Sequence, residues 1–177
     1  MTILVRPATP ADAPALGRMG GALARLHHDF DRERFMLPDD VESGYAWWLG
    51  RELTSDEAVV LVAEQGGEIV GYAYGRLEGR DWNALLDACG VLHDLWVDEG
   101  ARRSGAGARL AEAMLRRLRE LGAPRVVLSA AVKNEPARRL FGGLGFRPTL
   151  VEMTCELGPA GGGGDPPTPP DGRGRPG

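Results

Sequence analysis

The stretch "RRSGAGARL", from Arg102 to Leu110, places two arginines, a serine and two glycines directly before a predicted amphipathic helix. Glycine is a poor helix former, so its presence at a helix start needs a reason. A helix N-terminus presents unpaired N–H groups and the positive end of the macrodipole, which together bind phosphate. We expect Gly105 and Gly107 to let a pyrophosphate reach these N–H groups, while Arg102 and Arg103 add charge. The alternative is a glycine-rich helix start with solvated arginines.

Two well-known phosphate-binding motifs do not fit this stretch. No Gly-Lys-Ser/Thr follows, as a P-loop requires, and the first glycine of the Rossmann GxGxxG pattern is missing. The stretch instead joins a predicted strand at 90–99 to a predicted helix, whose apolar residues recur at helical spacing. These residues are Leu110, Met114, Leu118 and Leu121.

The rest of the chain alternates between strand and helix patterns. Thr9 and Asp12 have the spacing of a capping box before a helix with Leu16, Met19 and Leu23 on one face. Helices are also predicted at 41–53 and 135–145, and strands at 3–8, at 57–79 as a hairpin, at 125–132 and at 146–157, with 27–40 irregular. This order, β-α-α-β-β-β-α-β-α-β, predicts an α/β domain with a mixed sheet.

Composition narrows the function classes. The chain has 177 residues and a net charge of -4, which argues against a nucleic-acid binder held by a basic field. Neither Cys89 nor Cys155 belongs to a CxxC pair, so neither a disulfide framework nor a metal site is expected. No signal-peptide core and no apolar run of membrane-spanning length occurs. We expect a cytoplasmic protein without a membrane partner.

The last twenty residues, "GPAGGGGDPPTPPDGRGRPG", consist almost entirely of glycine, proline and a few charges. Such a segment cannot bury enough apolar surface to offset the entropy of ordering. We therefore expect a disordered tail at 158–177 and a folded domain at 1–157.

The glycine-containing loop at 102–107, together with "KNEPARRLFGGLGF" at 133–146, resembles motifs of the GCN5-related N-acetyltransferase (GNAT) family. The acyl-CoA loop of that family has the form Arg/Gln-x-x-Gly-x-Gly/Ala, which corresponds here to Arg102, Gly105 and Gly107. Its second mark is an asparagine followed by a short helix and Leu-Gly-Phe, which stands here as "KNEPARRLFGGLGF", residues 133–146. The resemblance implies a mixed β-sheet flanked by helices, with splayed fourth and fifth strands. It covers about residues 3–157.

The resemblance also implies which residues bind acetyl-CoA, the acyl donor. The strand at Leu95, Trp96 and Val97 would offer its backbone to the pantetheine arm, which lies beside it like an added strand. The loop would hold the pyrophosphate, and Asn134 would bond the pantetheine amides. The implied pyrophosphate residues are Arg102, Arg103, Ser104, Gly105, Ala106 and Gly107, and Ala137, Arg138 and Phe141 would line the CoA side. The resemblance allows a homodimer, a state that this family often forms.

The implied reaction is acetyl transfer to an amine, which needs a group to accept the amine's proton. Several family members place a base at the position of His93, and histidine titrates near neutral pH. Strand alternation places His93 on one face with Leu95 and Val97, and Asp94 on the opposite face. His93 is therefore the first candidate base and Asp94 the second, and the alternative for His93 is a structural, hydrogen-bonded histidine.

Phe141 departs from the family pattern, because many members have a tyrosine there that protonates the leaving thiolate. Tyr72, Tyr74 or water could replace that donor. The departure keeps a second function open, namely a degenerate acyl-CoA-binding or sensing domain without turnover.

The amine acceptor is expected to contact the region after the first helix. Asp39, Asp40 and Glu42 stand there beside Phe35, Tyr45, Trp47 and Trp48. Carboxylates and aromatic rings together hold cationic amines, although the tryptophans also fit helix packing. A polyamine, an aminoglycoside, an amino acid and a protein lysine all remain open as acceptors.

Overall fold

The computed structural model describes residues 2–158, which form a compact unit up to Arg147 and a second segment from Pro148. The predicted tail, apart from Gly158, lies outside the described residues. The compact unit contains, in chain order, β1 (Ile3–Pro7), α1 (Ala13–Phe30), α2 (Val41–Glu52), β2 (Ala58–Gln65), β3 (Glu68–Glu78), β4 (Cys89–Val97), α3 (Ala106–Glu120), β5 (Val126–Leu128) and α4 (Glu135–Gly143).

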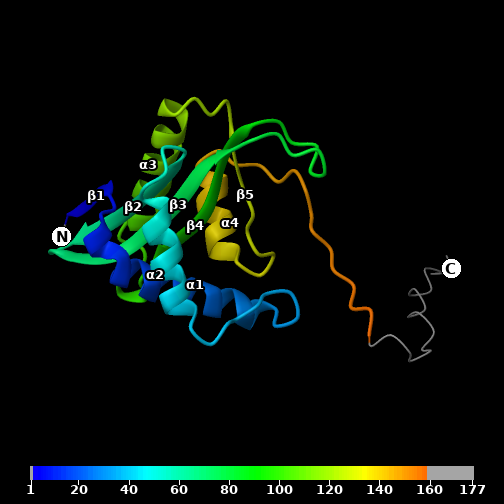
Figure 1. The fold of residues 1–177 in the computed structure, drawn as a ribbon, viewed down its shortest axis with the longest axis horizontal. Helices are drawn as coiled ribbons and strands as arrows, with labels where there is room; N and C mark the ends of the chain where they lie inside the picture. Colours follow the sequence, from blue (N-terminus) through cyan, green and yellow to red (C-terminus); the bar gives the residue numbers. More distant parts are fainter. Residues whose placement is uncertain (1, 159–177) are drawn as a thin grey trace, which may run out of the picture. The chain divides into compact units, whose positions relative to one another are not determined.

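The five strands form one mixed sheet in the order β1-β2-β3-β4-β5. The first four strands pair antiparallel, whereas β5 runs parallel to β4. Figure 1 shows α1 and α2 on one side of this sheet and α3 on the other. The predicted α/β class with a mixed, helix-flanked sheet is confirmed.

Each face of the sheet has its own hydrophobic cluster. On the α3 face, the buried Leu110, Met114 and Leu118 pack against strand residues such as Leu61 and Leu92. On the α1–α2 face, a second cluster gathers Leu16, Met19, Leu49, Val60, Val62, Tyr72 and Tyr74. The apolar stripes predicted for the first and third helices are therefore the faces that these helices bury.

The predicted capping box at Thr9 and Asp12 is present. One carboxylate oxygen of Asp12 accepts a hydrogen bond from the Thr9 N–H at 2.7 Å, and both oxygens accept from Arg6, at 2.8 and 3.0 Å. The hydrogen bond from Arg6 lowers the pKa of Asp12 from 3.8 to about 2. This cluster fixes the angle at which the chain leaves β1 and enters α1.

Three segments differ from the sequence-based expectation. Residues 27–30, expected to be irregular, complete α1, and β5 spans only 126–128 of the predicted 125–132. The strand predicted at 146–157 is wrong, because the described residues 146–158 contain no strand. Alternating apolar residues define a face for a strand, but they do not supply the partner whose N–H and C=O groups a ladder needs.

Small residues on α1 let α2 approach closely. A Cβ atom on Gly20 would lie 2.2 Å from Cδ1 of Tyr45, and one on Gly17 would lie 2.6 Å from the Glu42 carbonyl oxygen. Both distances are too short for non-bonded atoms, so the α1–α2 contact requires glycine at these positions. The glycines thereby determine where the Tyr45 ring lies.

We expect Gly20→Ala to lower the free energy of unfolding by about 1–3 kcal/mol, because the new methyl group overlaps the Tyr45 ring. Gly50→Ala in α2 is the matched control, since a Cβ there meets no atom within 4 Å. Alanine is the better helix former, so the control should keep or raise stability by about 0.5–1 kcal/mol. Urea unfolding measures both, and equal shifts in the same direction would contradict this account of the helix pair.

Candidate active site

The fourth strand loses its fifth-strand partner halfway along. β5 pairs with β4 only from Gly90 to Leu92, whereas β3 continues to pair with β4 as far as Val97. Residues 93–97 of β4 therefore keep one paired edge, and on the other edge the ladder with β5 has ended. Backbone N–H and C=O groups on such an edge can pair with an added extended segment.

A β-bulge lies where the two strands separate. Tyr74 is opposite Asp94 and Gly75 is opposite Leu92, so His93 is an extra residue without a partner on β3. Such a residue interrupts the alternation of side chains between the two faces of a strand.

The bulge corrects the predicted faces of β4. Leu92, rather than His93, shares the α3-side cluster with Leu95 and Val97. The His93 ring stacks on Tyr74, which belongs to the α1–α2-side cluster, with the ring centroids 5.3 Å apart. Asp94 accepts a hydrogen bond from Tyr72 of that same cluster. The expectation that His93 and Asp94 lie on opposite faces is therefore wrong.

Both side chains line one cavity of about 790 Å³. Its walls come from α1, α2 and the loop between them, from β4, and from the segment joining β5 to α4. Of the predicted site residues, it brings together His93, Asp94, Leu95, Asn134, Ala137 and Phe141. The splayed strands thus open into a space that residues far apart in the sequence enclose.

Asp94 is the buried carboxylate of this cavity, with 9% of its surface exposed. The Tyr72 hydroxyl donates to its Oδ2 at 2.9 Å. Burial raises the pKa of Asp94 above 3.8, although the Tyr72 hydrogen bond and the charges of His93 and His27 act in the opposite direction. The pKa of Tyr45, another lining residue, is also raised. Burial is the larger cause and the negative charge of Asp94 the smaller one. A buried carboxylate of this kind favours a cationic guest.

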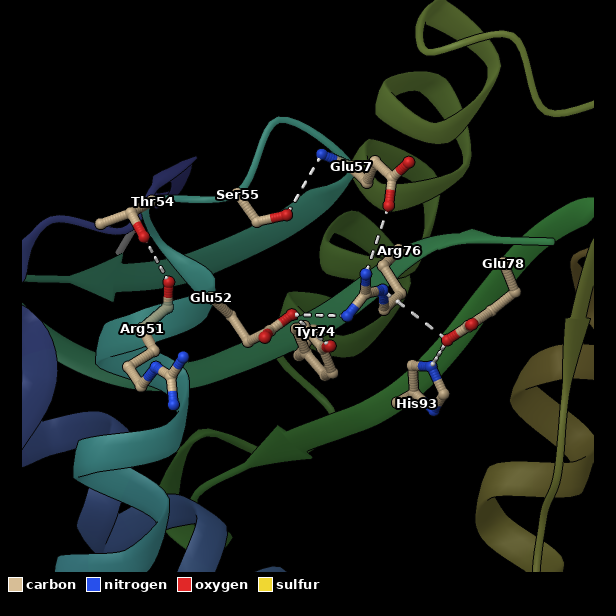
Figure 2. Close-up of polar contacts among 9 residues, drawn as sticks. All are labelled: Arg51, Glu52, Thr54, Ser55, Glu57, Tyr74, Arg76, Glu78 and His93. Carbon is tan, nitrogen blue, oxygen red and sulfur yellow. Dashed lines mark hydrogen bonds and ion pairs between the residues drawn. The ribbon is translucent and has the colours of Figure 1, made fainter.

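His93 is held by Glu78 rather than by solvent alone. Its Nε2 lies 3.1 Å from Oε1 of Glu78, and because a carboxylate oxygen accepts, Nε2 is the donor, which in a neutral ring leaves the lone pair on Nδ1. Figure 2 shows this contact at one end of a polar network that Arg76 connects. The guanidinium of Arg76 lies 3.3 Å from both Glu52 and Glu57.

The contact between Arg76 and Glu78 is electrostatic. Arg76 Nε lies 3.7 Å from Oε1 of Glu78, beyond hydrogen-bond range, and among the described residues this buried nitrogen has no hydrogen-bond partner. The guanidinium charge nevertheless keeps the Glu78 carboxylate beside the imidazole. The arrangement matches that of a general base oriented by a second group.

The helix start that follows β4 has a conformation that needs glycine. Gly105 is the N-cap of α3 with φ = +90°, and a Cβ there would meet no atom within 4 Å. The requirement for glycine is therefore conformational rather than a matter of space within the chain. Arg103 also has a positive φ, of 64°, and the Ser104 hydroxyl donates to the Ala101 carbonyl at 2.6 Å. The same hydroxyl oxygen accepts a hydrogen bond from the Ala106 N–H, the first of α3, at 3.3 Å.

Arg102 lies against β4. Its Nε donates to the Val97 carbonyl oxygen at 3.1 Å, and its guanidinium lies over the Trp96 ring, 5.1 Å from the centroid. Gly107 brings α3 close to the same place, because a Cβ on it would be 3.7 Å from a methyl group of Val97 and 3.4 Å from Leu140. The helix start, the end of β4 and α4 are therefore adjacent.

The site residues predicted in and just before α4 differ in whether they line the cavity. Asn134 is the N-cap of α4 and accepts from the Ala137 N–H at 3.3 Å through its side-chain oxygen. Phe141 is 8% exposed and packs edge-on against Phe146. Arg138, in contrast, is exposed and is not among the residues that line the cavity.

Sequence reasoning missed several lining or supporting residues. Glu78 escaped notice because its approach to His93 depends on the bulge and on hairpin register. Leu23 was read only as a helix residue and His27 as part of an irregular segment, although both belong to α1 and line the cavity. Trp48, which the sequence left open between packing and pocket, does both, since it packs on Tyr74 and lines the cavity.

The two tyrosines considered as proton donors are both engaged. Tyr72 donates to Asp94, and Tyr74 donates to Glu52 at 2.7 Å. Both hydroxyl groups therefore already donate hydrogen bonds to carboxylates near the site.

Among residues 2–158, no group of three or more His, Cys, Asp or Glu side chains has the arrangement of a metal site. Within the same residues, no helix has the length and apolar character needed to cross a membrane.

Comparison with known proteins identifies the family. The model of the acetyltransferase (GNAT) family matches residues 22–146, and the chain belongs to that family. It is 30% identical over 137 residues to the uncharacterized N-acetyltransferase YhfO of Bacillus subtilis, covering 77% of this chain and 85% of that protein. It is also 36% identical over 124 residues to an N-alpha-acetyltransferase of Sulfurisphaera tokodaii, covering 67% and 72% of the two chains.

Solved structures share the fold. A variant of the BH1408 protein from Bacillus halodurans matches with a TM-score of 0.75 and 20% identity, covering 87% of this chain and 99% of that one. The architecture is therefore that of the family, with the cavity at the point where β4 and β5 separate.

Asp94→Asn should leave the protein at least as stable as the wild type at neutral pH. A raised pKa in the folded state means that ionisation of Asp94 costs stability, so its favourable contribution is present below the ordinary carboxyl value and is lost as the pH rises. The variant's advantage should therefore grow from about pH 4 upward and become constant near neutrality. Thermal unfolding across this range measures it.

Tyr72→Phe is the control of opposite sign. It removes the donor to Asp94 and should lower stability by about 1–3 kcal/mol, because a buried charge loses its hydrogen bond. If Asp94→Asn destabilises the fold as strongly as Tyr72→Phe, the carboxylate is a structural element and the account of the site is wrong.

Proposed function

We propose that this chain transfers an acetyl group from acetyl-CoA to a primary amine. The observation that carries the proposal is the end of β4. There, the edge of β4 continues beyond its ladder with β5, and the start of α3 is capped by a glycine. The imidazole of His93 and the carboxylate of Asp94 both line the cavity at this place. Membership of the GNAT family and relatives named as N-acetyltransferases support the reaction class.

The donor would bind along the separated strand. The pyrophosphate would accept hydrogen bonds from N–H groups at the start of α3, with Arg102 and Arg103 providing charge. The pantetheine arm would pair with Leu95 to Val97 as an added strand. Arg102 would then release the Val97 carbonyl and turn toward phosphate. The side-chain NH₂ of Asn134 remains able to donate while its oxygen caps α4.

The chemistry follows from the two side chains that the bulge places at the cavity. The Asp94 carboxylate attracts the acceptor in its ammonium form, which loses one proton to solvent and so becomes a neutral amine with a lone pair. Nδ1 of His93 takes a second proton from the nitrogen as it attacks. That nitrogen forms a bond to the thioester carbonyl carbon, and backbone N–H groups at the end of β4 stabilise the oxyanion. The C–S bond then breaks with its electron pair on sulfur. The products are an amide and CoA, whose thiolate regains a proton from the imidazolium.

Phe141 does not prevent this reaction. A thiol with a pKa of roughly 8.5 leaves readily as thiolate, and the imidazolium of His93 carries the proton that the sulfur needs. Glu78 stabilises the positive charge on that ring during the transfer. The proposal therefore assigns both proton steps to His93, with Glu78 as its positioning residue.

His93→Gln should reduce kcat for thiol release by about 10²-fold or more while CoA affinity stays nearly constant, because the base is lost and the CoA site is not. Glu78→Gln should reduce kcat by about tenfold and displace the acidic limb of the pH–rate profile, with KM for acetyl-CoA unchanged. Stopped assays of free thiol over a range of pH measure both effects.

Glu57→Gln is the matched control, because Glu57 is exposed and pairs with the same Arg76, whereas the carboxylate that contacts His93 is that of Glu78. It should leave the rate and the pH profile as in the wild type. CoA binding without thiol release for any amine would instead identify a sensing domain and would contradict the proposed enzyme.

A further inference from the structure

We infer that the acceptor is a small primary monoamine carried on an apolar, aromatic-sized body. The inference rests on the proposed function and concerns the part of the cavity that α1, α2 and the loop at 31–40 enclose. Three observations carry it: the apolar character of these walls, the buried carboxylate of Asp94 among the described lining residues, and the limited volume of the cavity.

The walls on the α1–α2 side are mainly apolar. Leu23 of α1, Phe35 of the loop, and Val41 and Trp48 of α2 all line this part of the cavity. A polyhydroxylated amine would leave its hydroxyl groups against these side chains, where the loss of water is not compensated. A hydrocarbon or aromatic body would instead exchange water contact for favourable burial. The lining therefore selects against aminoglycoside-like acceptors.

The charge pattern allows one ammonium group. Asp94 is the buried carboxylate among the described lining residues, whereas Asp40 and Arg34 are exposed. A guest with one ammonium group can place it at Asp94 and its body against Leu23 and Trp48. A polyamine would place its further charges along apolar walls. The pattern therefore favours a monoamine.

Two hydrogen bonds hold the loop at 31–40 and the end of α1 beside the cavity. The His28 imidazole donates through Nδ1 to the Phe35 carbonyl at 2.8 Å, so the loop folds back on α1. Lys133 Nζ donates to the Phe30 carbonyl at 2.5 Å and connects the end of α1 to the segment before α4. The cavity measures about 790 Å³, and the reacting end of the thioester would occupy the part near Leu95 and Phe141, which limits the volume left for the guest. A small molecule fits this space better than the end of a polypeptide.

The test is calorimetric binding to the CoA-saturated full chain, with 2-phenylethylamine, spermidine, kanamycin and a short peptide with a free N-terminus as probes. Phenylethylamine should bind at least about tenfold more tightly than each of the others. Preference for spermidine, kanamycin or the peptide overturns the inference, and so does the absence of phenylethylamine binding. Thiol release from acetyl-CoA is measured separately, so that tight binding without release contradicts the proposed function and leaves the inference intact.

Variants locate the binding surface. Phe35→Ser should weaken phenylethylamine binding by about tenfold, whereas Leu37→Ser, in the same loop but outside the lining, should not change it. Asp94→Asn should weaken binding at least as much, and the exposed Asp56→Asn is its control. Equal effects of Phe35→Ser and Leu37→Ser, or unchanged binding in Asp94→Asn, would overturn the inference. Both control positions lie outside the proposed catalytic machinery.

Discussion

The extra residue in β4 is the constraint on which the site depends. Without the bulge at His93, side chains would alternate strictly, and the imidazole and the neighbouring carboxylate would face opposite sides of the sheet. With it, Leu92 stays in the α3-side core while His93 and Asp94 both reach the cavity. Because of this one bulge, β4 contributes apolar side chains to the core on one side of the sheet and two polar side chains to the cavity on the other.

The site also depends on the end of the β4–β5 ladder at Leu92. Beyond it, β4 is supported by β3 alone, and the space that opens is closed by side chains from α1, α2 and α4. The close α1–α2 contact at Gly20 lies beside Tyr45, which lines the same cavity as Asp94, and burial raises the pKa of the Asp94 carboxyl group. The local stability of the fold and the electrostatics of the site therefore depend on the same packing.

The sequence predicted the parts of this protein that local physics determines. The capping box at Thr9, the hairpin at 57–79 and the amphipathic helix after Gly105 depend on nearby residues, and all three are present. The placement of His93 relative to Asp94 was predicted wrongly, because a bulge is a property of two paired strands. Glu78 and His93 are 15 positions apart in the sequence, and Lys133 is 103 positions from Phe30, whose carbonyl it contacts. Periodicity carries no information on such distant pairs.

Amide hydrogen exchange of the full chain with and without CoA tests the central claim most directly, namely that the end of β4 and the start of α3 form the donor site. CoA should slow exchange at residues 93–97 and at the first turn of α3, residues 106–108, because the pantetheine arm and the pyrophosphate accept or cover these N–H groups. The loop at 79–88, between β3 and β4, should be unchanged and serves as an internal reference. Slowed exchange confined to that loop, or unchanged exchange at 93–97 in protein saturated with CoA, would contradict the claim.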